Sequence, residues 1–155
     1  MKYLMKYLLL VIFLLFSTVV EAAPKMSVKK STKLQFGDVA SSVSGSGTVV
    51  VPATSDSRII TGSLYGFGGQ VTRAKFKVSK GTANAFVTIV LPSSLTVSKG
   101  GVTLTVNNLT LSVSNVVQLD ANGALTFYVG GTLNIPTNQT PQNGLKGDLF
   151  VEVLE

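Results

Sequence analysis

Short apolar runs with a period of two residues are the feature that most constrains how this chain can fold. The clearest run lies near the C-terminus, where these apolar or small residues alternate with polar ones: Leu145, Gly147, Leu149, Val151 and Val153. Such alternation places the apolar set on one face of a half-buried β-strand. Phe150 and Leu154 lie on the polar face instead. They would pack beneath a loop, pair with side chains of another strand or mark a subunit contact.

Similar runs follow one another from about residue 34, separated by clusters of Gly, Ser, Asn and Pro. This spacing is typical of a β-sandwich or barrel, and the abundance of Val, Thr and Ser favours pleated strands. The glycine pairs, Gly130–Gly131 among them, are interpreted as tight turns or close backbone crossings. We expect strands at residues 34–36, 48–51, 58–64, 71–78, 86–91, 103–106, 109–119, 125–129, 132–135 and 149–154.

The N-terminus has the pattern of a cleavable export signal. Lys2 and Lys6 precede an apolar stretch over residues 7–16, and small residues follow it. We expect a signal helix at residues 1–22 with cleavage after Ala22, cleavage after Ala23 being the second choice. A retained anchor is the alternative, but a spanning helix needs about 20 apolar residues. The exported protein would reside in the periplasm, on the outer surface or outside a Gram-negative cell, with no membrane span after cleavage.

Residues 23–33 are polar and basic, so they are interpreted as a leader into a single domain at residues 34–155. The chain has no Cys and no His. No disulfide can therefore hold the exported fold, which depends on core packing. The commonest metal ligands and the commonest general base are also missing, so we expect no metal and no cofactor.

Catalytic patterns are weak throughout. The glycine clusters lack the Gly-x-x-x-x-Gly-Lys-Ser/Thr run and the helix that a phosphate-binding loop requires. Ser27 and Lys30 match a loose Ser-x-x-Lys pattern without its downstream partners. Asp120 belongs to a predicted turn, while Asp148 and Glu152 fall on the polar face of one strand, which does not indicate an acid and base pair. We therefore expect a protein that is not an enzyme.

Two sets of side chains are candidates for partner contact. Arg73, Lys75 and Lys77 alternate along one predicted strand and would face an anionic glycan, lipid headgroups or an acidic subunit, the alternative being a face that serves solubility alone. Phe76 points the other way, so the face lacks the interleaved aromatics of a nucleic-acid platform. Aromatic side chains of a predicted loop at residues 65–70, with Tyr128, are candidates for stacking on sugar rings. The candidate contact residues are Tyr65, Phe67, Arg73, Lys75, Lys77 and Phe150.

Several segments together are typical of one family: LQFG at 34–37, GTVVV at 47–51, Arg58 with TG at 61–62, AKFKV at 74–78, FVTIVLP at 86–92 and VGGTL at 129–133. From about residue 34 to 153 the chain resembles the bacterial secreted family known as domain of unknown function 4402. VGGTL is the most specific segment. The family usually has Tyr-Ser-Gly where this chain has Leu145, Lys146 and Gly147, so no role is carried over for an aromatic hydroxyl.

The resemblance implies an immunoglobulin-like antiparallel β-sandwich related to pilin and adhesin subunits, and it implies no enzyme activity. The leading hypothesis is an exported structural or adhesive surface component, such as a fimbrial subunit. It would assemble with itself or other surface subunits by strand addition. The leader supports a donated strand weakly, because only Met26 and Val28 are apolar there. The alternative is a monomeric extracytoplasmic module that binds carbohydrate or an envelope component.

Overall fold

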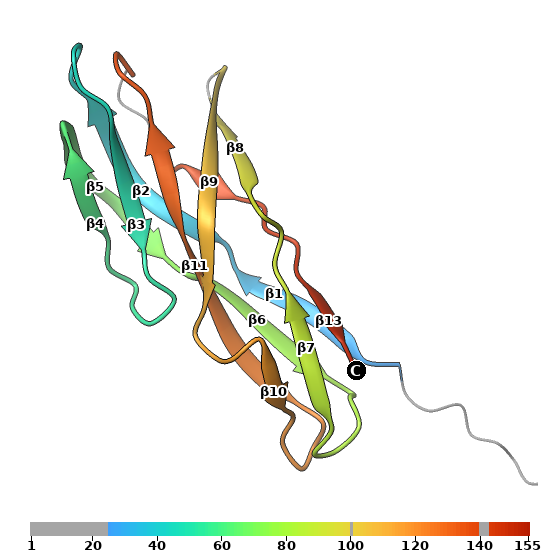
Figure 1. Cartoon of the computed structure of the whole chain (residues 1–155). Coiled ribbons are helices and arrows are strands. Elements are labelled where there is room, and N and C mark those ends of the chain that lie inside the picture. The colour runs from blue at the N-terminus through green and yellow to red at the C-terminus, as the bar shows by residue number, and fades with distance from the viewer. Residues whose placement is uncertain (1–24, 100, 140–142) are drawn as a thin grey trace, which may run out of the picture.

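The computed structural model describes residues 25–99, 101–139 and 143–155. These residues form thirteen β-strands and no helix, which confirms the all-β prediction (Figure 1). The predicted export signal, residues 1–22, lies outside the described residues. Nor does the described part contain a helix with the length and hydropathy of a membrane span.

The described strands form three sheets, and their pairs are antiparallel. The largest sheet has seven strands: β1 (Ser27–Thr32), β6 (Ala74–Ser79), β11 (Leu125–Ile135), β3 (Gly47–Val51), β4 (Ile59–Gly62), β9 (Val102–Leu111) and β8 (Leu95–Lys99). One small sheet has the order β10 (Val116–Gln118), β7 (Phe86–Val90) and β13 (Glu152–Leu154). The other has the order β12 (Lys146–Gly147), β2 (Leu34–Ser41) and β5 (Leu64–Thr72).

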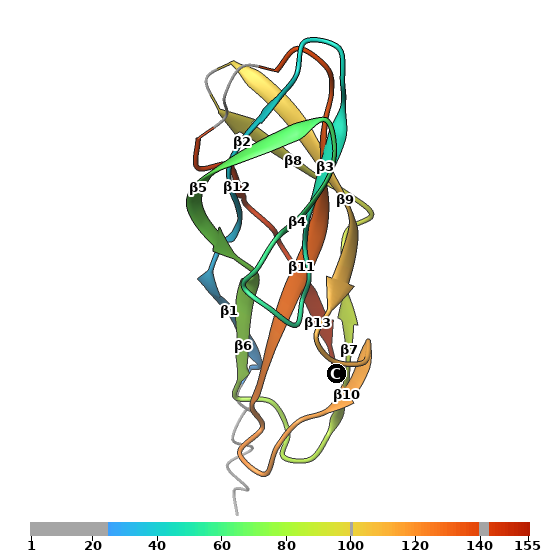
Figure 2. The same ribbon diagram turned by 90° about the vertical axis from the view of Figure 1, so that its left-hand side faces the viewer.

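Strand β11 organises the large sheet and runs along most of the molecule (Figure 2). Its first half pairs with β6, and its second half pairs with β3 and β9. Gly130 and Gly131 lie inside this strand, so the prediction of a tight turn at this pair was wrong, whereas the alternative of a close backbone crossing is confirmed at Gly130. One strand replaces the two expected there. A Cβ on Gly130 would lie 2.2 Å from the backbone oxygen of Val51. Glycine is needed because the chain after β3 passes directly over β11.

The core is one cluster of buried apolar side chains drawn from all three sheets. Phe76 and Phe127 are cross-strand partners of β6 and β11, and their rings stack with centroids 5.4 Å apart. Phe36, Ile89 and Val153 enter the same cluster from the two small sheets. Leu145, Leu149 and Val153 are buried while Phe150 and Leu154 are exposed, which confirms the alternation predicted near the C-terminus.

The predicted leader is wrong in one respect, because its residues 27–32 form β1 at the edge of the large sheet. Val28 and Met26 are partly buried and pack against the core, while Lys29 faces solvent. An edge strand needs only one shielded face and tolerates lysine. A polar composition therefore does not exclude a strand here, and the sheet begins at Ser27 rather than Leu34.

The predicted loop at residues 65–70 is likewise part of a strand, β5. Its glycines suggested a loop, but β2 supplies a ladder for residues 64–72, with register irregularities around Asp38. Glycine is common where a ladder is interrupted in this way. Ser63 separates β5 from β4, and Arg73 separates it from β6, so the expected strands 58–64 and 71–78 are each divided.

The remaining differences concern the extent of strands. β3 and β7 match the expected positions, and Pro92 and Pro136 follow the ends of β7 and β11 as predicted. The expected strands 103–106 and 109–119 are replaced by β9 and β10, and only the last part of 149–154 is a strand. β8 lies outside the expected strands. The two-residue β12 falls within the alternating run at residues 145–153, but before the expected strand 149–154.

Candidate partner-binding surface

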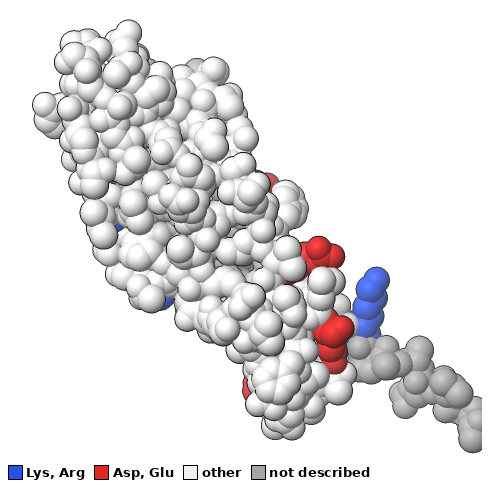
Figure 3. All heavy atoms as spheres, in the orientation of Figure 1, with Lys and Arg blue, Asp and Glu red and all other residues white. Residues whose placement is uncertain are grey.

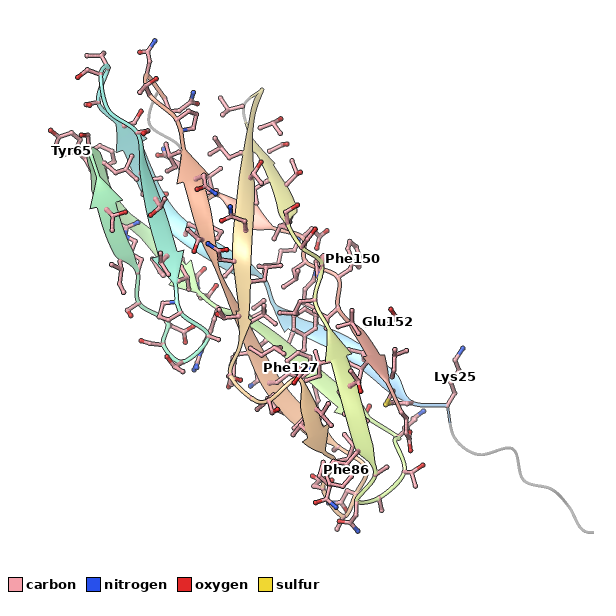
Figure 4. All side chains as sticks on the ribbon, viewed as in Figure 1. Lys25, Tyr65, Phe86, Phe127, Phe150 and Glu152 are labelled. Carbon is pink, nitrogen blue, oxygen red and sulfur yellow. The ribbon has the colours of Figure 1, made fainter. Side chains whose placement is uncertain are left out.

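The predicted contact residues do not come together in one site. Tyr65 and Phe150 lie far apart in Figure 4, at the β5 side and at the segment before β13. Lys75 and Lys77 belong to β6, and Arg73 precedes that strand. The structure therefore separates the candidates into a basic strand, an aromatic strand and an apolar surface.

Arg73 is held inside the fold rather than offered to a partner. Its Nη1 donates a hydrogen bond to the backbone oxygen of Ala53 at 3.0 Å, and its Nε lies 3.4 Å from Asp56 Oδ1. The guanidinium also lies over the ring of Tyr128, 3.8 Å from the centroid. This geometry uses the charge of Arg73 to fix the loop after β3 against β11, and it covers one face of the Tyr128 ring.

Lys77 remains exposed on β6, opposite Lys29 of β1, while Lys75 is half-buried with its Nζ 5.8 Å from the Tyr128 ring centroid. Phe76 between them is buried, so the prediction that it points away from the lysines is confirmed. The basic strand β6 thus carries two lysines, and the neighbouring ring of Tyr128 is already in contact with Arg73.

The larger exposed feature is the outer face of the sheet β10-β7-β13, which we call the β7 surface. It carries these exposed apolar side chains: Phe86, Val90, Val116 and Leu154, with Phe150 beside it. In register, Val116 and Leu154 lie on either side of Thr88. Val87 and Ile89 occupy the inner face, so Phe86 and Val90 lie on the outer face with Thr88 between them. Clustered apolar exposure of this kind marks interaction sites.

Phe150 is the most exposed aromatic ring of the described residues, at 78%. Two open pockets flank it. One is lined by Val90, Leu91, Pro92, Phe150, Val151 and Glu152. The other is lined by Pro92, Ser94, Leu95, Thr96, Asp148, Leu149 and Phe150. The ring therefore contributes to both pockets, on the chain that leads into β13, where Figure 4 labels it.

Lys30 of β1 holds the segment 148–150, which precedes β13, through its side chain. Its ammonium group pairs with Asp148, donates to the backbone oxygen of Leu149 at 3.3 Å and lies 5.1 Å from the centroid of the Phe150 ring. The hydrogen bond and charge of Lys30 hold the pKa of Asp148 below its ordinary value of 3.8, with a smaller contribution from Lys33. Side chains thus connect β1 to the segment before β13.

Both of these strands have a free edge. β1 ends the large sheet and β13 ends its small sheet, and within the described residues no ladder joins the two. Acidic side chains gather along the side of the molecule where β13 lies, whereas the broad face over β3, β9 and β11 is almost uncharged in the view of Figure 3. Asp148, Glu152 and Glu155 are the exposed acidic residues of this C-terminal stretch.

Sequence reasoning identified Phe150 and Leu154 as exceptions but did not place Phe86, Val90 and Val116 beside them. The available signal was the run FVTIV of β7, in which apolar residues occupy both faces and only Thr88 is polar. Only the fold shows which of its faces is outside. In the described part of the chain no three acidic side chains come close enough to hold a metal ion.

A scan against protein-family models matches residues 26–153 to the domain of unknown function (DUF4402). The match begins at Met26, so it includes β1 as well as the segments from which the resemblance was predicted. No match was found among curated proteins or among solved structures. Because the family model covers nearly all of the described strands, the prediction from sequence is confirmed, and the chain belongs to the DUF4402 family.

Proposed function

We propose that the protein is an exported, non-enzymatic structural component of the bacterial cell surface, built on an immunoglobulin-like sandwich and assembled by strand addition. Its partners are further copies of itself or other surface subunits. The single observation that carries this proposal is the free edge of β13 beside the exposed apolar β7 surface. Export is supported by the N-terminal sequence pattern, and the absence of His and Cys supports a scaffold rather than an enzyme.

Strand addition fits the chemistry of this edge. An incoming extended segment would exchange backbone hydrogen bonds with β13, and its alternate side chains would fall roughly 7 Å apart on one face. The two pockets on either side of Phe150 would accept such side chains. The outward side chains of the added strand would pack beside Phe150 and Leu154, which would contribute about 1.5–3 kcal/mol for each side chain that becomes fully buried.

The free edge of β1 is less suited to assembly than that of β13. β1 carries Lys29 and Lys30, and its register with β6 is irregular between Lys30 and Thr32. Lysines and bulges are the devices by which edge strands avoid pairing with other chains. Met26 and Val28, the apolar residues of the expected donor strand, pack against their own core. Of these two edges, β13 is therefore the one that would accept the added strand.

The experiment compares the purified protein with the double variant Phe150→Lys and Leu154→Lys. We expect the unchanged protein to form concentration-dependent oligomers or fibres in size analysis and negative-stain microscopy. The double variant should remain monomeric, because two lysines at the edge oppose pairing. Val43→Lys is the matched control, since Val43 is 81% exposed in the turn after β2.

Three results would contradict the proposal. Monomers of the unchanged protein at every concentration would exclude assembly between copies. Oligomers that persist in the double variant, with circular dichroism unchanged, would show that the contact lies elsewhere. A variant Val43→Lys that also loses assembly would reject the β13 edge as the specific site.

A further inference from the structure

Strand β5 displays two exposed aromatic rings. Tyr65 is 63% exposed and Phe67 is 61% exposed, and the two residues lie close together on β5, where its register with β2 shifts between Gly66 and Gly68. Tyr65 lies at the opposite side of the molecule from Phe150 (Figure 4). This pair is therefore separate from the β7 surface, and nothing in the proposed assembly uses it.

The reverse side of β5 is packed, so the rings stand on a fixed support. A Cβ on Gly66, between the two aromatics, would come within 2.5 Å of Arg58 Nη2 and 2.8 Å of Ile60 Cδ1. Arg58 Nη1 donates to the backbone oxygens of Phe36 at 3.0 Å and Asp38 at 3.2 Å. These bonds tie the support to β2. A binding surface that is already ordered loses less entropy when a ligand binds.

The surroundings of the rings are neutral and polar. Ser63 and Gln70 are exposed, and glycines fill the strand between them. The charge of Arg58 is turned to backbone oxygens, and Asp38 Oδ1 accepts a hydrogen bond from the Gly144 backbone N–H at 2.7 Å. The β7 surface differs, because aliphatic side chains surround its phenylalanines. Isolated rings in a neutral polar setting do not form the contiguous apolar patch expected of a protein interface.

We propose that Tyr65 and Phe67 form a stacking platform for a neutral carbohydrate. The apolar C–H face of a pyranose ring suits an exposed aromatic face, and its hydroxyl groups suit the surrounding hydroxyl and amide groups. β5 also ends its sheet, so the outer edge of its backbone offers N–H and C=O groups to sugar hydroxyls. Among the described residues, the charged side chains of Arg58 and Asp38 next to β5 are engaged with backbone groups, which favours neutral over anionic sugars. The inference goes beyond the proposed assembly and does not depend on it.

The test uses the purified full chain on an array of neutral oligosaccharides (glucan, mannan, galactan and N-acetylglucosamine types) and anionic ones (uronate, sulfated and sialylated types). We expect binding to neutral members. The affinity for the best array member, measured in solution by calorimetry, should fall by about tenfold or more in Tyr65→Ala and in Phe67→Ala, a change of ~1.4 kcal/mol. Tyr65→Phe should retain most of the affinity, because the ring remains.

Phe86→Ala is the matched control, since this ring is equally exposed but belongs to the β7 surface. It should bind the oligosaccharide as the unchanged protein does. The proposal is overturned if no neutral oligosaccharide binds, if only anionic ones bind, or if the two alanine variants keep full affinity while circular dichroism shows that they are folded. The variant Phe150→Lys with Leu154→Lys should keep the affinity in solution, so failure of assembly and failure of sugar binding are read separately.

Discussion

At the scale of single residues, the stacked pair Phe76 and Phe127 connects two strands at the centre of the core. Both rings are almost fully buried, and each is the direct cross-strand neighbour of the other. Aromatic pairs of this kind contribute about 0.5–1.5 kcal/mol beyond the burial of their surface. The alternation in KFKV predicted that Phe76 faces inward. Its partner Phe127 could not be predicted, because the local sequence of two distant strands does not determine how they pair in register.

Removal of one ring tests this contact. Phe127→Ala should lower the free energy of unfolding by about 3–5 kcal/mol, because a cavity remains where the ring was. Phe86→Ala should change it by no more than about 0.5 kcal/mol, since that ring is exposed. Urea unfolding followed by far-UV circular dichroism measures both values, and the chain has no Trp to follow by fluorescence. Equal effects of the two substitutions would contradict the assigned core.

The pair of Lys30 and Asp148 predicts a pH dependence. The pKa of the Asp148 carboxyl group is lowered in the fold. Asp148 therefore contributes stability at pH values above its ordinary pKa of 3.8, and this stability is lost as the pH falls through the pKa of the folded state. Lys30→Met should raise the pKa of Asp148 toward 3.8 in a titration followed by carbon NMR of its carboxyl group. Lys29→Met, on the opposite face of β1, is the control. An unchanged Asp148 titration in Lys30→Met would show that the pair does not persist in solution.

At the scale of elements, prediction succeeded where a strand has one wet face and one dry face. β3 and β7 were expected at nearly their observed bounds. β1 was missed because a polar edge strand resembles a linker, and β5 because its glycines resemble a turn. In both cases a neighbouring strand supplies the ladder, and that information lies elsewhere in the chain. The candidate surface followed the same rule: the exceptions Phe150 and Leu154 were visible in sequence, whereas their neighbours from β7 and β10 were not.

The assignment of β1 to the domain gives a test by deletion. Removal of residues 27–32 should lower the midpoint of thermal unfolding and promote aggregation, because β6 would then present an unpaired edge. Deletion of residues 1–24 should leave the midpoint unchanged, since the described strands begin at Ser27. Size analysis after heating completes the comparison. Equal midpoints for the two deletions would restore the interpretation of residues 23–33 as a leader outside the fold.

At the scale of the whole molecule, the chain has two exposed surfaces of different character. The β7 surface is apolar and adjoins a free edge, whereas the Tyr65 and Phe67 platform is neutral and rests on a packed strand. Their separation in Figure 4 means that copies joined through β13 would leave the aromatic platform uncovered. The sequence indicated an all-β fold and its family. It could not indicate this separation, because the two surfaces are defined by strand order rather than by local pattern.

The strand ends nearest the two termini meet at one turn. Ser27 pairs with Ser79, and the Glu155 carboxylate accepts a hydrogen bond from the Thr82 backbone N–H, so both ends adjoin residues 79–82. A pulling force applied through Ser27 and Glu155 would therefore load the ladders of β1 and β13 from the same end. Their hydrogen bonds would break one after another, as in a zipper, rather than all together. Force applied at the two chain ends would therefore separate β1 and β13 from their neighbouring strands. Force applied through an added strand beside β13 would not act on the turn at residues 79–82.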